Sequence, residues 1–369
     1  NMEISKRAKL LMPNAIDSVF SIMDSTPYIM NLAGGTPLFL IPEDILSSFM
    51  KKAQNNSSFY QYPRYTQGIL PLRNCIAKDL SEEFGYNVSP DNILITNGSD
   101  QGIDLIFRVF TKVNDEVIIP SPSFAMFYQC AQMCGNKIIT PTYNNMDGSF
   151  PVDELLRSIN KKTRLIIICN PNNPTGFLVG LDTIEQILIK AKTAIVLVDE
   201  AYFEYSKLSA VKLIQKYPNL VITRTFSKAF GLAALRVGYI IANNQIIKEL
   251  KKVRGPYDIN MAGAIAVPAV LNDLSPLNSY LNEVMTVSKP MVENFFKDYG
   301  IYFYPSNSGF ILFKPKNANV VFESLKKEGF LLRPRNGFGF DDTLRLTFGT
   351  AKQTKEFIEI YKKICLKDK

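Results

Sequence analysis

The sequence predicts an α/β protein in which a mostly parallel sheet, covered by helices on both faces, is joined to a smaller α+β lobe. In the middle of the chain, short β-branched apolar runs alternate with longer helical patterns, which is typical of parallel strands and crossover helices. The run Leu165-Ile166-Ile167-Ile168 has no polar alternation, so both faces of its strand must be covered. The 369 residues suffice for one large core and a smaller second one.

The strands of the sheet are expected between residues 92 and 242. The individual ranges are 92–96, 116–120, 165–169, 194–198, 220–223 and 237–242. Beyond residue 249 the pattern changes, because a long helical stretch at 277–299 precedes strand patterns at 308–315 and 343–348. We therefore expect an N-terminal arm at 1–40 that packs on the smaller domain or on a partner subunit, a large domain at 41–255 and a small domain at 256–369.

Composition excludes several classes of protein. The chain has no histidine, which rules out Ser-His-Asp and Cys-His catalysis and removes the usual imidazole ligands of zinc, so no metal site is expected. The net charge of +8 comes with scattered lysine pairs rather than one dense stripe, so no nucleic-acid partner is expected. No apolar run reaches the ~18 to 20 residues of a membrane span or forms a signal peptide, so a cytoplasmic location is expected.

Lys228 lies in the stretch Thr225-Phe226-Ser227-Lys228-Ala229-Phe230, which runs through small residues to Arg236. An amine beside a hydroxyl and an arginine suits a site that holds an aldehyde next to a phosphate, as in pyridoxal phosphate. A surface lysine with an ion-pair partner would give the same pattern, so this stretch alone does not decide between the two interpretations.

Two loops follow predicted strands, where ligands bind in open α/β sheets. Gly98-Ser99-Asp100-Gln101-Gly102 opens a helix, and its small residues allow backbone N–H groups to approach a phosphate, although an ordinary helix cap has the same composition. Asn170-Pro171-Asn172-Asn173-Pro174-Thr175-Gly176 contains two Asn-Pro steps, of which one is a candidate for a cis bond. Such a rigid turn favours a function in which an Asn amide is aimed inward.

Two further segments also follow strands. In Asp199-Glu200-Ala201-Tyr202, a carboxylate at the strand end can pair with a protonated pyridine nitrogen, and the tyrosine can hydrogen-bond a phenolic oxygen. The rival interpretation, a nucleotide-dependent metal site, needs a phosphate loop in which Gly precedes Lys, and no such pair occurs. Phe124 in Pro122-Ser123-Phe124-Ala125-Met126-Phe127 suits stacking on a heteroaromatic ring, but it suits the core equally well.

With these motifs the chain resembles the fold-type I pyridoxal-phosphate enzymes of the class I/II aminotransferases, nearest the histidinol-phosphate aminotransferase-like branch. The resemblance runs from the Gly-x-Pro stretch near residue 35 to Leu344-Arg345-Leu346-Thr347-Phe348-Gly349-Thr350. It implies the aspartate aminotransferase-like fold, pyridoxal 5'-phosphate as cofactor, an amino acid and a 2-oxo acid as substrates, and a homodimer with shared active sites.

The resemblance also implies roles for single residues. Lys228 matches the Schiff-base lysine and Asp199 the partner of the pyridine nitrogen, which makes these two residues and Tyr202 the expected catalytic group. The other expected cofactor contacts are Ser99, Asp100, Phe124, Asn173, Ser227, Arg236 and Tyr62. Tyr62 matches the tyrosine that reaches the phosphate from the other subunit of the dimer. Arg345 matches the clamp for the substrate carboxylate, while Arg333, Asn173 and Gly35 complete the expected substrate contacts. Both arginines would also fit a structural role in the small lobe.

The reaction and substrate are less sharply defined. The same apparatus serves transamination, decarboxylation and carbon-sulfur cleavage, so a decarboxylase or lyase is the close alternative, and a non-catalytic small-molecule-binding α/β protein is the alternative from another class. The chain has Pro13-Asn14 in place of the Pro-Tyr step, and Ala33-Gly34-Gly35-Thr36-Pro37 in place of the Asn-Glu-Asn-Pro-like segment, of the histidinol-phosphate branch. Both differences remove polar groups, so we expect preference for an unphosphorylated, large or aromatic amino acid over histidinol phosphate.

Overall fold

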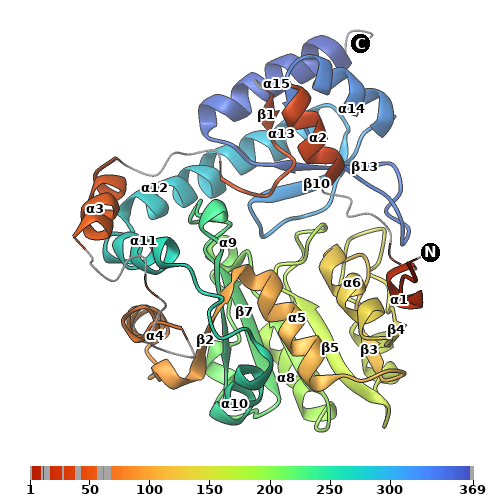
Figure 1. The fold of residues 1–369 in the computed structure, drawn as a ribbon. Coiled ribbons are helices and arrows are strands. Elements are labelled where there is room, and N and C mark those ends of the chain that lie inside the picture. The colour runs from red at the N-terminus through yellow and green to blue at the C-terminus, as the bar shows by residue number, and fades with distance from the viewer. Residues whose placement is uncertain are drawn as a thin grey trace.

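A seven-stranded sheet forms the centre of the larger lobe (Figure 1). The computed structural model describes residues 2–9, 11, 17–26, 29–37, 43–55, 61 and 68–365. In spatial order the strands are β2 (Ile93–Asn97), β8 (Val237–Ala242), β7 (Leu220–Thr225), β6 (Ile195–Asp199), β5 (Thr163–Cys169), β3 (Glu116–Ile118) and β4 (Lys137–Ile139). The six predicted strands are confirmed, and the short edge strand β4 was not predicted.

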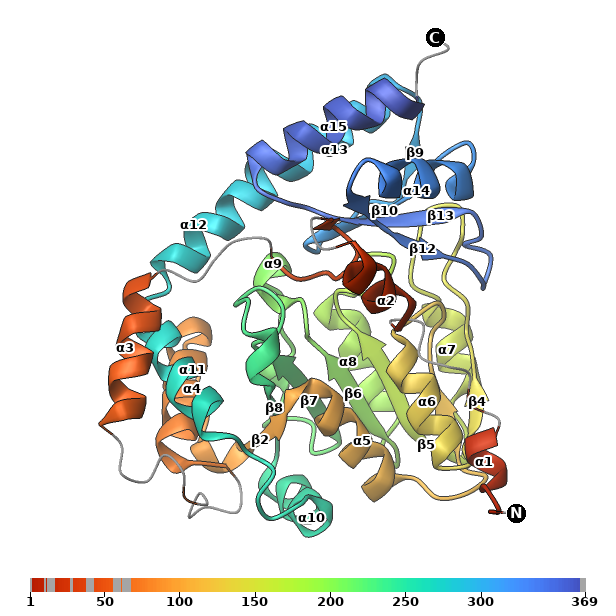
Figure 2. The ribbon, with the colours of Figure 1, turned by 45° about the horizontal axis from the view of Figure 1, so that its top comes forward.

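Helices cover both faces of this sheet (Figure 2). Those of the larger lobe and its flank are α3 (Glu43–Gln54), α4 (Leu70–Phe84), α5 (Gly98–Phe110), α6 (Ala125–Met133), α7 (Val152–Ser158), α8 (Leu181–Lys190), α9 (Phe203–Ser206), α10 (Asn244–Val253) and α11 (Met261–Asn272). No helix in the described ranges is both long and apolar enough to span a lipid bilayer.

The central strands are buried on both faces, as their unbroken apolar runs predict. Alternate residues of β5 enter two separate cores: Ile166 and Ile168 pack with α8 on one face, and Leu165 and Ile167 pack with α5 on the other. All four side chains are fully buried. At roughly 1.5 to 3 kcal/mol for each large aliphatic side chain, burial on two faces makes these strands the most stabilising part of the lobe.

Strand β8 runs antiparallel to both of its neighbours, whereas β3 to β7 are mutually parallel. The connection from β7 to β8 carries only the short 3-10 turn Ala233–Leu235 and no crossover helix, so it is too short to bring the chain back to the far edge. Consequently the end of β7, the start of β8 and the end of β2 meet at one edge, where Asn97 pairs with Val237.

The smaller lobe contains a four-stranded antiparallel sheet in the order β12 (Arg333–Arg335), β13 (Thr343–Thr347), β10 (Phe310–Lys314) and β9 (Tyr302–Phe303). Its helices are α12 (Ser275–Glu283), the π-helical turn Val284–Ser288, α13 (Lys289–Asp298), α14 (Ala318–Lys327) and α15 (Ala351–Cys365). The predicted long helix at 277–299 and the two strand patterns are thus present.

The first residues are not uniformly irregular. Helix α1 (Lys6–Lys9) lies on the large lobe, where Arg7 Nη1 donates to the carbonyl of Met133 at 2.9 Å. Helix α2 (Asp17–Ser25) and strand β1 (Met30–Asn31) follow, and β1 pairs in parallel with β11 (Phe330–Leu331) of the small lobe. The expected contact of the arm with the small lobe therefore applies to its second half.

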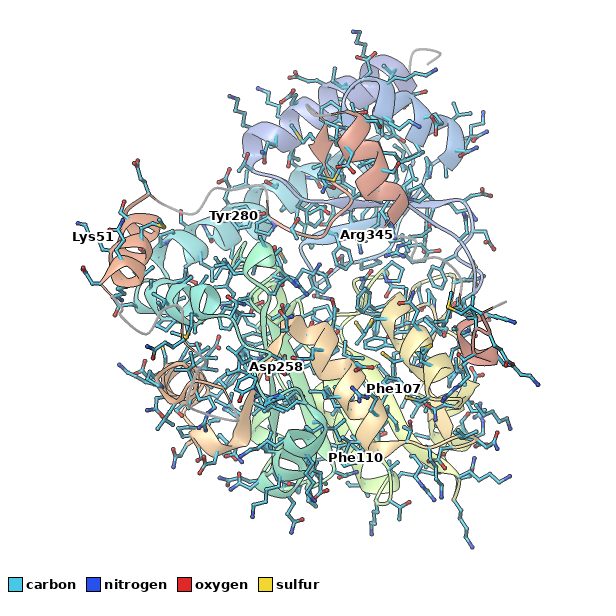
Figure 3. The ribbon with its side chains drawn as sticks, viewed as in Figure 1. Lys51, Phe107, Phe110, Asp258, Tyr280 and Arg345 are labelled. Atoms are coloured by element: carbon cyan, nitrogen blue, oxygen red, sulfur yellow. The ribbon has the colours of Figure 1, made fainter. Side chains whose placement is uncertain are left out.

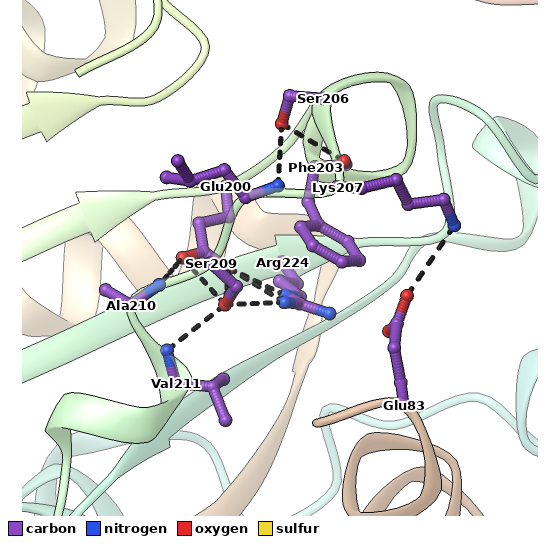
Figure 4. A network of polar contacts seen from close by, with 10 residues as sticks. Glu83, Glu200, Phe203, Ser206, Lys207, Ser209, Ala210, Val211 and Arg224 are labelled. Carbon is purple, nitrogen blue, oxygen red and sulfur yellow. Dashed lines mark hydrogen bonds and ion pairs between the residues drawn. The ribbon is translucent and has the colours of Figure 1, made fainter. Parts of the chain in front are cut away.

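A buried ion pair lies beneath the loop that follows β6 (Figure 4). Arg224 Nη2 lies 2.9 Å from Glu200 Oε2, and the two side chains are 3% and 0% exposed. Ser209 Oγ and the backbone N–H of Ala210 also donate to the Glu200 carboxylate. Nearby, burial raises the pKa of Glu204 to about 7 against the lowering effect of Arg224. Arg224 therefore compensates two carboxylates that the core would otherwise destabilise.

We predict that Arg224→Met destabilises the folded protein strongly, because it leaves Glu200 buried without a cation. The loss is expected to be about 3 to 5 kcal/mol, seen as a lower urea midpoint. Lys216→Met is the control, since its partner Glu185 lies at the surface 2.6 Å away and solvent replaces the lost contact. Equal midpoints for both variants would contradict a special role of the buried pair.

Candidate active site

A cavity of about 680 Å³ opens between the carboxyl edge of the large sheet and the small lobe. Most residues singled out in the sequence line it, although they come from seven separate segments. They are Ser99, Asp100, Phe124, Asn173, Asp199, Tyr202, Ser227, Lys228, Arg236, Arg333 and Arg345. Gly35 borders the cavity through Tyr202, and Tyr62 lies outside the described residues. The strand-end arrangement expected from the sequence thus brings one set of polar groups together.

Lys228 follows the end of β7 and is the amine of the cavity. Its Nζ donates to the carbonyl of Gly34 at 3.4 Å and lies 5.6 Å from the centre of the Tyr202 ring. The segment Gly34–Gly35 therefore reaches across from the N-terminal arm to the carboxyl edge of the large sheet. A primary amine that is only partly buried keeps access to a small molecule in the cavity.

Asp199, at the end of β6, supplies a buried carboxylate. Thr223 Oγ1 donates to its Oδ1 at 2.7 Å, and Cys169 Sγ lies 3.9 Å from Oδ2. Burial raises the pKa of Asp199 to about 7, while the Thr223 hydrogen bond and the charge of Lys228 lower it. A carboxylate in this setting is complementary to a protonated ring nitrogen, which would supply the missing positive partner.

A separate group of polar atoms lies at the start of helix α5. Arg236 Nη1 lies 3.4 Å from Ser227 Oγ, and Arg236 Nη2 lies 3.4 Å from Asp100 Oδ2. Gly98 makes the close approach possible, because it has φ +73° and a Cβ there would lie 2.3 Å from Arg236 Nη2. A helix N-terminus with a guanidinium and a hydroxyl beside it is suited to bind a phosphate.

Asn173 is held by the rigid turn after β5. Both of its Asn-Pro steps, 170–171 and 173–174, are cis, and Asn170 exchanges hydrogen bonds with the backbone of Val179 at 2.8 and 3.0 Å. The Oδ1 atom of Asn173 accepts from Arg345 Nη1 at 2.7 Å and from Arg335 Nη2 at 3.1 Å. Because the carbonyl oxygen is taken by the arginines, the amide nitrogen is the group available for an oxygen of a ligand.

Tyr202 fixes the side of the cavity next to the small lobe. Its ring meets Phe310 edge to face, with centroids 5.0 Å apart and an angle of 85°. Gly35 packs directly on its hydroxyl, since it has φ +65° and a Cβ there would lie 2.8 Å from that oxygen. The phenol is thereby confined between the arm and the sheet.

Phe124 lines the cavity where helix α6 begins. Its ring also meets Phe127 edge to face at 5.7 Å. One face can therefore contact a ring bound in the cavity while its edge belongs to the core, so that the two interpretations of this residue are compatible.

Three arginines enter the cavity from the small lobe, and sequence reasoning identified only two of them. Arg333 and Arg345 were expected, and Figure 3 shows Arg345 between the small lobe and the large sheet. Arg335 was missed, although the alternation Arg333-Pro334-Arg335 in a strand places both arginines on the same face. The cavity thus has a buried carboxylate at the end of the large sheet and an excess of guanidinium groups on the side of the small lobe.

Comparison with known sequences gives a consistent family. Residues 27–360 match the family described as aminotransferase class I and II. The chain is 34% identical over 347 residues to the histidinol-phosphate aminotransferase of Thermoanaerobacter sp. (strain X514), covering 93% of this chain and 95% of that protein. It is 31% identical to histidinol-phosphate aminotransferase 1 of Bacillus anthracis, covering 86% of this chain and 90% of the relative.

Solved structures show the same fold. The histidinol-phosphate aminotransferase of Sinorhizobium meliloti, solved in complex with pyridoxal-5'-phosphate, superimposes with a TM-score of 0.83 at 19% identity, covering 98% of this chain and 97% of that one. The aspartate aminotransferase of Thermus thermophilus with maleate gives a TM-score of 0.85 at 18% identity, covering 99% and 100%. The predicted aspartate aminotransferase-like fold is therefore confirmed, and the chain belongs to the class I and II aminotransferase family.

Proposed function

We propose that this chain binds pyridoxal 5'-phosphate in the cavity described above and moves an amino group between an amino acid and a 2-oxo acid. The observation that carries the proposal is that one cavity contains an accessible amine, a buried carboxylate and a guanidinium group suited to bind a phosphate. These groups belong to Lys228, Asp199 and Arg236. These three groups are complementary to the aldehyde, the ring nitrogen and the phosphate of this cofactor.

The fit can be stated group by group. Lys228 would carry the cofactor covalently. The raised pKa of Asp199 fits a buried carboxylate whose positive partner would be the protonated ring nitrogen of the cofactor. Tyr202 and the amide nitrogen of Asn173 would hold the phenolic oxygen, and Phe124 would lie against the ring. The phosphate would lie on the first turn of α5 with Ser99, Asp100, Ser227 and Arg236 around it.

When bound, the cofactor withdraws electrons from the bonds at the substrate Cα, which makes the amino group transferable. The protein contributes binding and proton transfer. Arg345 would hold the substrate carboxylate with its planar fork, and Asn173 Oδ1 orients that fork by accepting a hydrogen bond from Arg345 Nη1. Lys228 Nζ would take the proton from Cα and deliver it to the C4′ carbon of the cofactor, since no histidine is present to do so.

We also propose a homodimer with shared active sites, in which Tyr62 of each subunit reaches the cofactor phosphate of the other subunit. The basis is the family resemblance, because Tyr62 lies outside the described residues. We also propose that the chain is divided into an N-terminal arm at 1–40, a large domain at 41–255 and a small domain at 256–369. Cross-linking and the molar mass in solution test the dimer directly.

The attachment site gives a first prediction. Borohydride reduction of the protein loaded with pyridoxal phosphate, followed by peptide mapping, should place the label on Lys228, and Lys228→Ala should lose both the label and the visible absorption band. Lys207→Ala is the control, because that lysine pairs with Glu83 outside the cavity at 3.6 Å. A label on another lysine would refute the assignment.

A second prediction concerns Asp199. Asp199→Asn should retain the cofactor but lose at least about 100-fold in turnover, because the amide cannot keep the ring nitrogen protonated. Asp104→Asn, at a partly exposed site of α5, controls for a nonspecific effect of charge removal. Near-normal turnover in Asp199→Asn would show that this carboxylate does not have the proposed role.

The same residue predicts a pH dependence of stability in cofactor-free protein. Burial raises the pKa of Asp199 from 3.8 to about 7, so between these values the folded state holds a proton that the unfolded state has released. The free energy of unfolding therefore falls as pH rises through this range. Asp199→Asn should be more stable than the parent by on the order of 2 to 4 kcal/mol at pH 8, and no more stable near pH 4. Denaturant titrations at both pH values test this, and a constant difference would contradict it.

A further inference from the structure

Three arginines share one face of the small sheet where it meets the cavity. Arg333 and Arg345 are directly opposite in the antiparallel pair of β12 and β13, and Arg335 lies two residues further along β12. Residues two apart in a strand point to the same side, and directly opposed residues have their Cβ atoms about 4.5 to 5.5 Å apart. Like charges in such positions are destabilising, so the arrangement needs a compensating group.

The described part of the chain does not supply that group. None of the ion pairs found among the described residues joins Arg333, Arg335 or Arg345 to a carboxylate. Instead, one nitrogen of each guanidinium is buried without a hydrogen-bond partner there: Nη1 of Arg333, Nε of Arg335 and Nε of Arg345. Buried donors of charged groups are costly to leave unsatisfied, so three at one site indicate an anionic ligand.

The electrostatics agree with this geometry. Burial, and to a lesser extent the charge of Arg345, lowers the pKa of Arg333 to about 10. The pKa of Arg335 is also well below its usual value, first through burial and then through Arg345 and Arg333. Burial lowers the pKa of Arg345 as well. Since arginine stays protonated in proteins, these lowered pKa values indicate that all three charges are destabilised.

Building on the proposed function, which gives Arg345 to the substrate carboxylate, we propose that Arg335 is a specificity-determining residue that binds, together with Arg333, a second anionic group of the substrate. The substrate class is an amine that brings two negative charges, through a side-chain carboxylate or a phosphate ester. Arg335 lines the cavity and is joined to Arg345 through the shared acceptor Asn173 Oδ1, so the two guanidinium groups reach the same space.

The positive charges of the three arginines argue against a substrate with a neutral side chain. An amino acid with an apolar or aromatic side chain would neutralise one guanidinium and leave the other two without an anion. A dicarboxylate or a phosphate dianion offsets two of the three charges and accepts several N–H bonds in the planar geometry that guanidinium groups favour. The sequence-based expectation of an unphosphorylated, large or aromatic substrate did not include Arg335, which favours an anionic one.

The test measures kcat/KM of the loaded enzyme and of Arg335→Met with glutamate, histidinol phosphate and phenylalanine as amino donors. Loss of a charge-assisted contact should lower kcat/KM for the preferred anionic donor by roughly 10- to 100-fold and leave the value for phenylalanine within about threefold. Histidinol phosphate has no α-carboxylate, so its phosphate dianion would take the place of the two carboxylates of glutamate. The donor with the larger loss therefore shows whether the site is built for a dicarboxylate or for a phosphate. Arg335→Lys should recover part of the loss, and Arg157→Met, at an exposed site of α7, should change none of the three values.

A binding measurement separates this inference from the proposed function, because it needs no turnover. Calorimetry should show that Arg335→Met weakens binding of succinate about tenfold or more while binding of butyrate, which has one carboxylate, is unchanged. Equal losses for the two acids, or for all three amino donors, would overturn the role of Arg335. Failure of the proposed function would appear differently, as absence of the cofactor label on Lys228.

Discussion

The burial of the central strands on both faces determines where this protein can place the polar groups of its cavity. Ile166, Ile168, Leu165 and Ile167 fill two cores on opposite faces of β5, so the central part of this strand has no room for a polar cavity. The polar residues of the cavity lie instead where the strands end, and the parallel strands all end at one edge. Because β8 returns without a crossover, the segment that carries Lys228 joins the same edge. The cavity therefore follows from the packing of the sheet.

The cavity combines two opposite electrostatic deficits. At the base, burial holds the Asp199 carboxylate without a full positive partner and raises its pKa to about 7. On the side of the small lobe, Arg333, Arg335 and Arg345 have no carboxylate partner among the described residues. Each deficit costs stability in the unliganded protein, and each matches the charge of a different ligand, a ring cation at one end and an anionic substrate at the other. Sites that bind tightly are commonly destabilised in this way.

Much of this could be predicted from the sequence, because the signals were local. Unbroken apolar runs gave the central strands, and the turns after them gave Asn173, Asp199 and Lys228. The antiparallel direction of β8 and the short strand β4 depend on chain length and pairing partners, which a strand pattern does not encode. Arg335 was missed for a related reason: its importance lies in a register that places it beside Arg345, and register is a property of the folded sheet.

The N-terminal arm connects the two ends of the cavity without neutralising either. Lys228 Nζ donates to the carbonyl of Gly34, and Arg345 Nη2 donates to the carbonyl of Ala33, the preceding residue. A backbone carbonyl orients a cationic side chain but carries no net charge, so each donor keeps its attraction for a cofactor or for a carboxylate. Gly35 then packs on Tyr202, and the backbone of Leu32 pairs with Thr347 at 2.8 Å. One short segment thus aligns groups from both lobes while leaving their charges available for ligands.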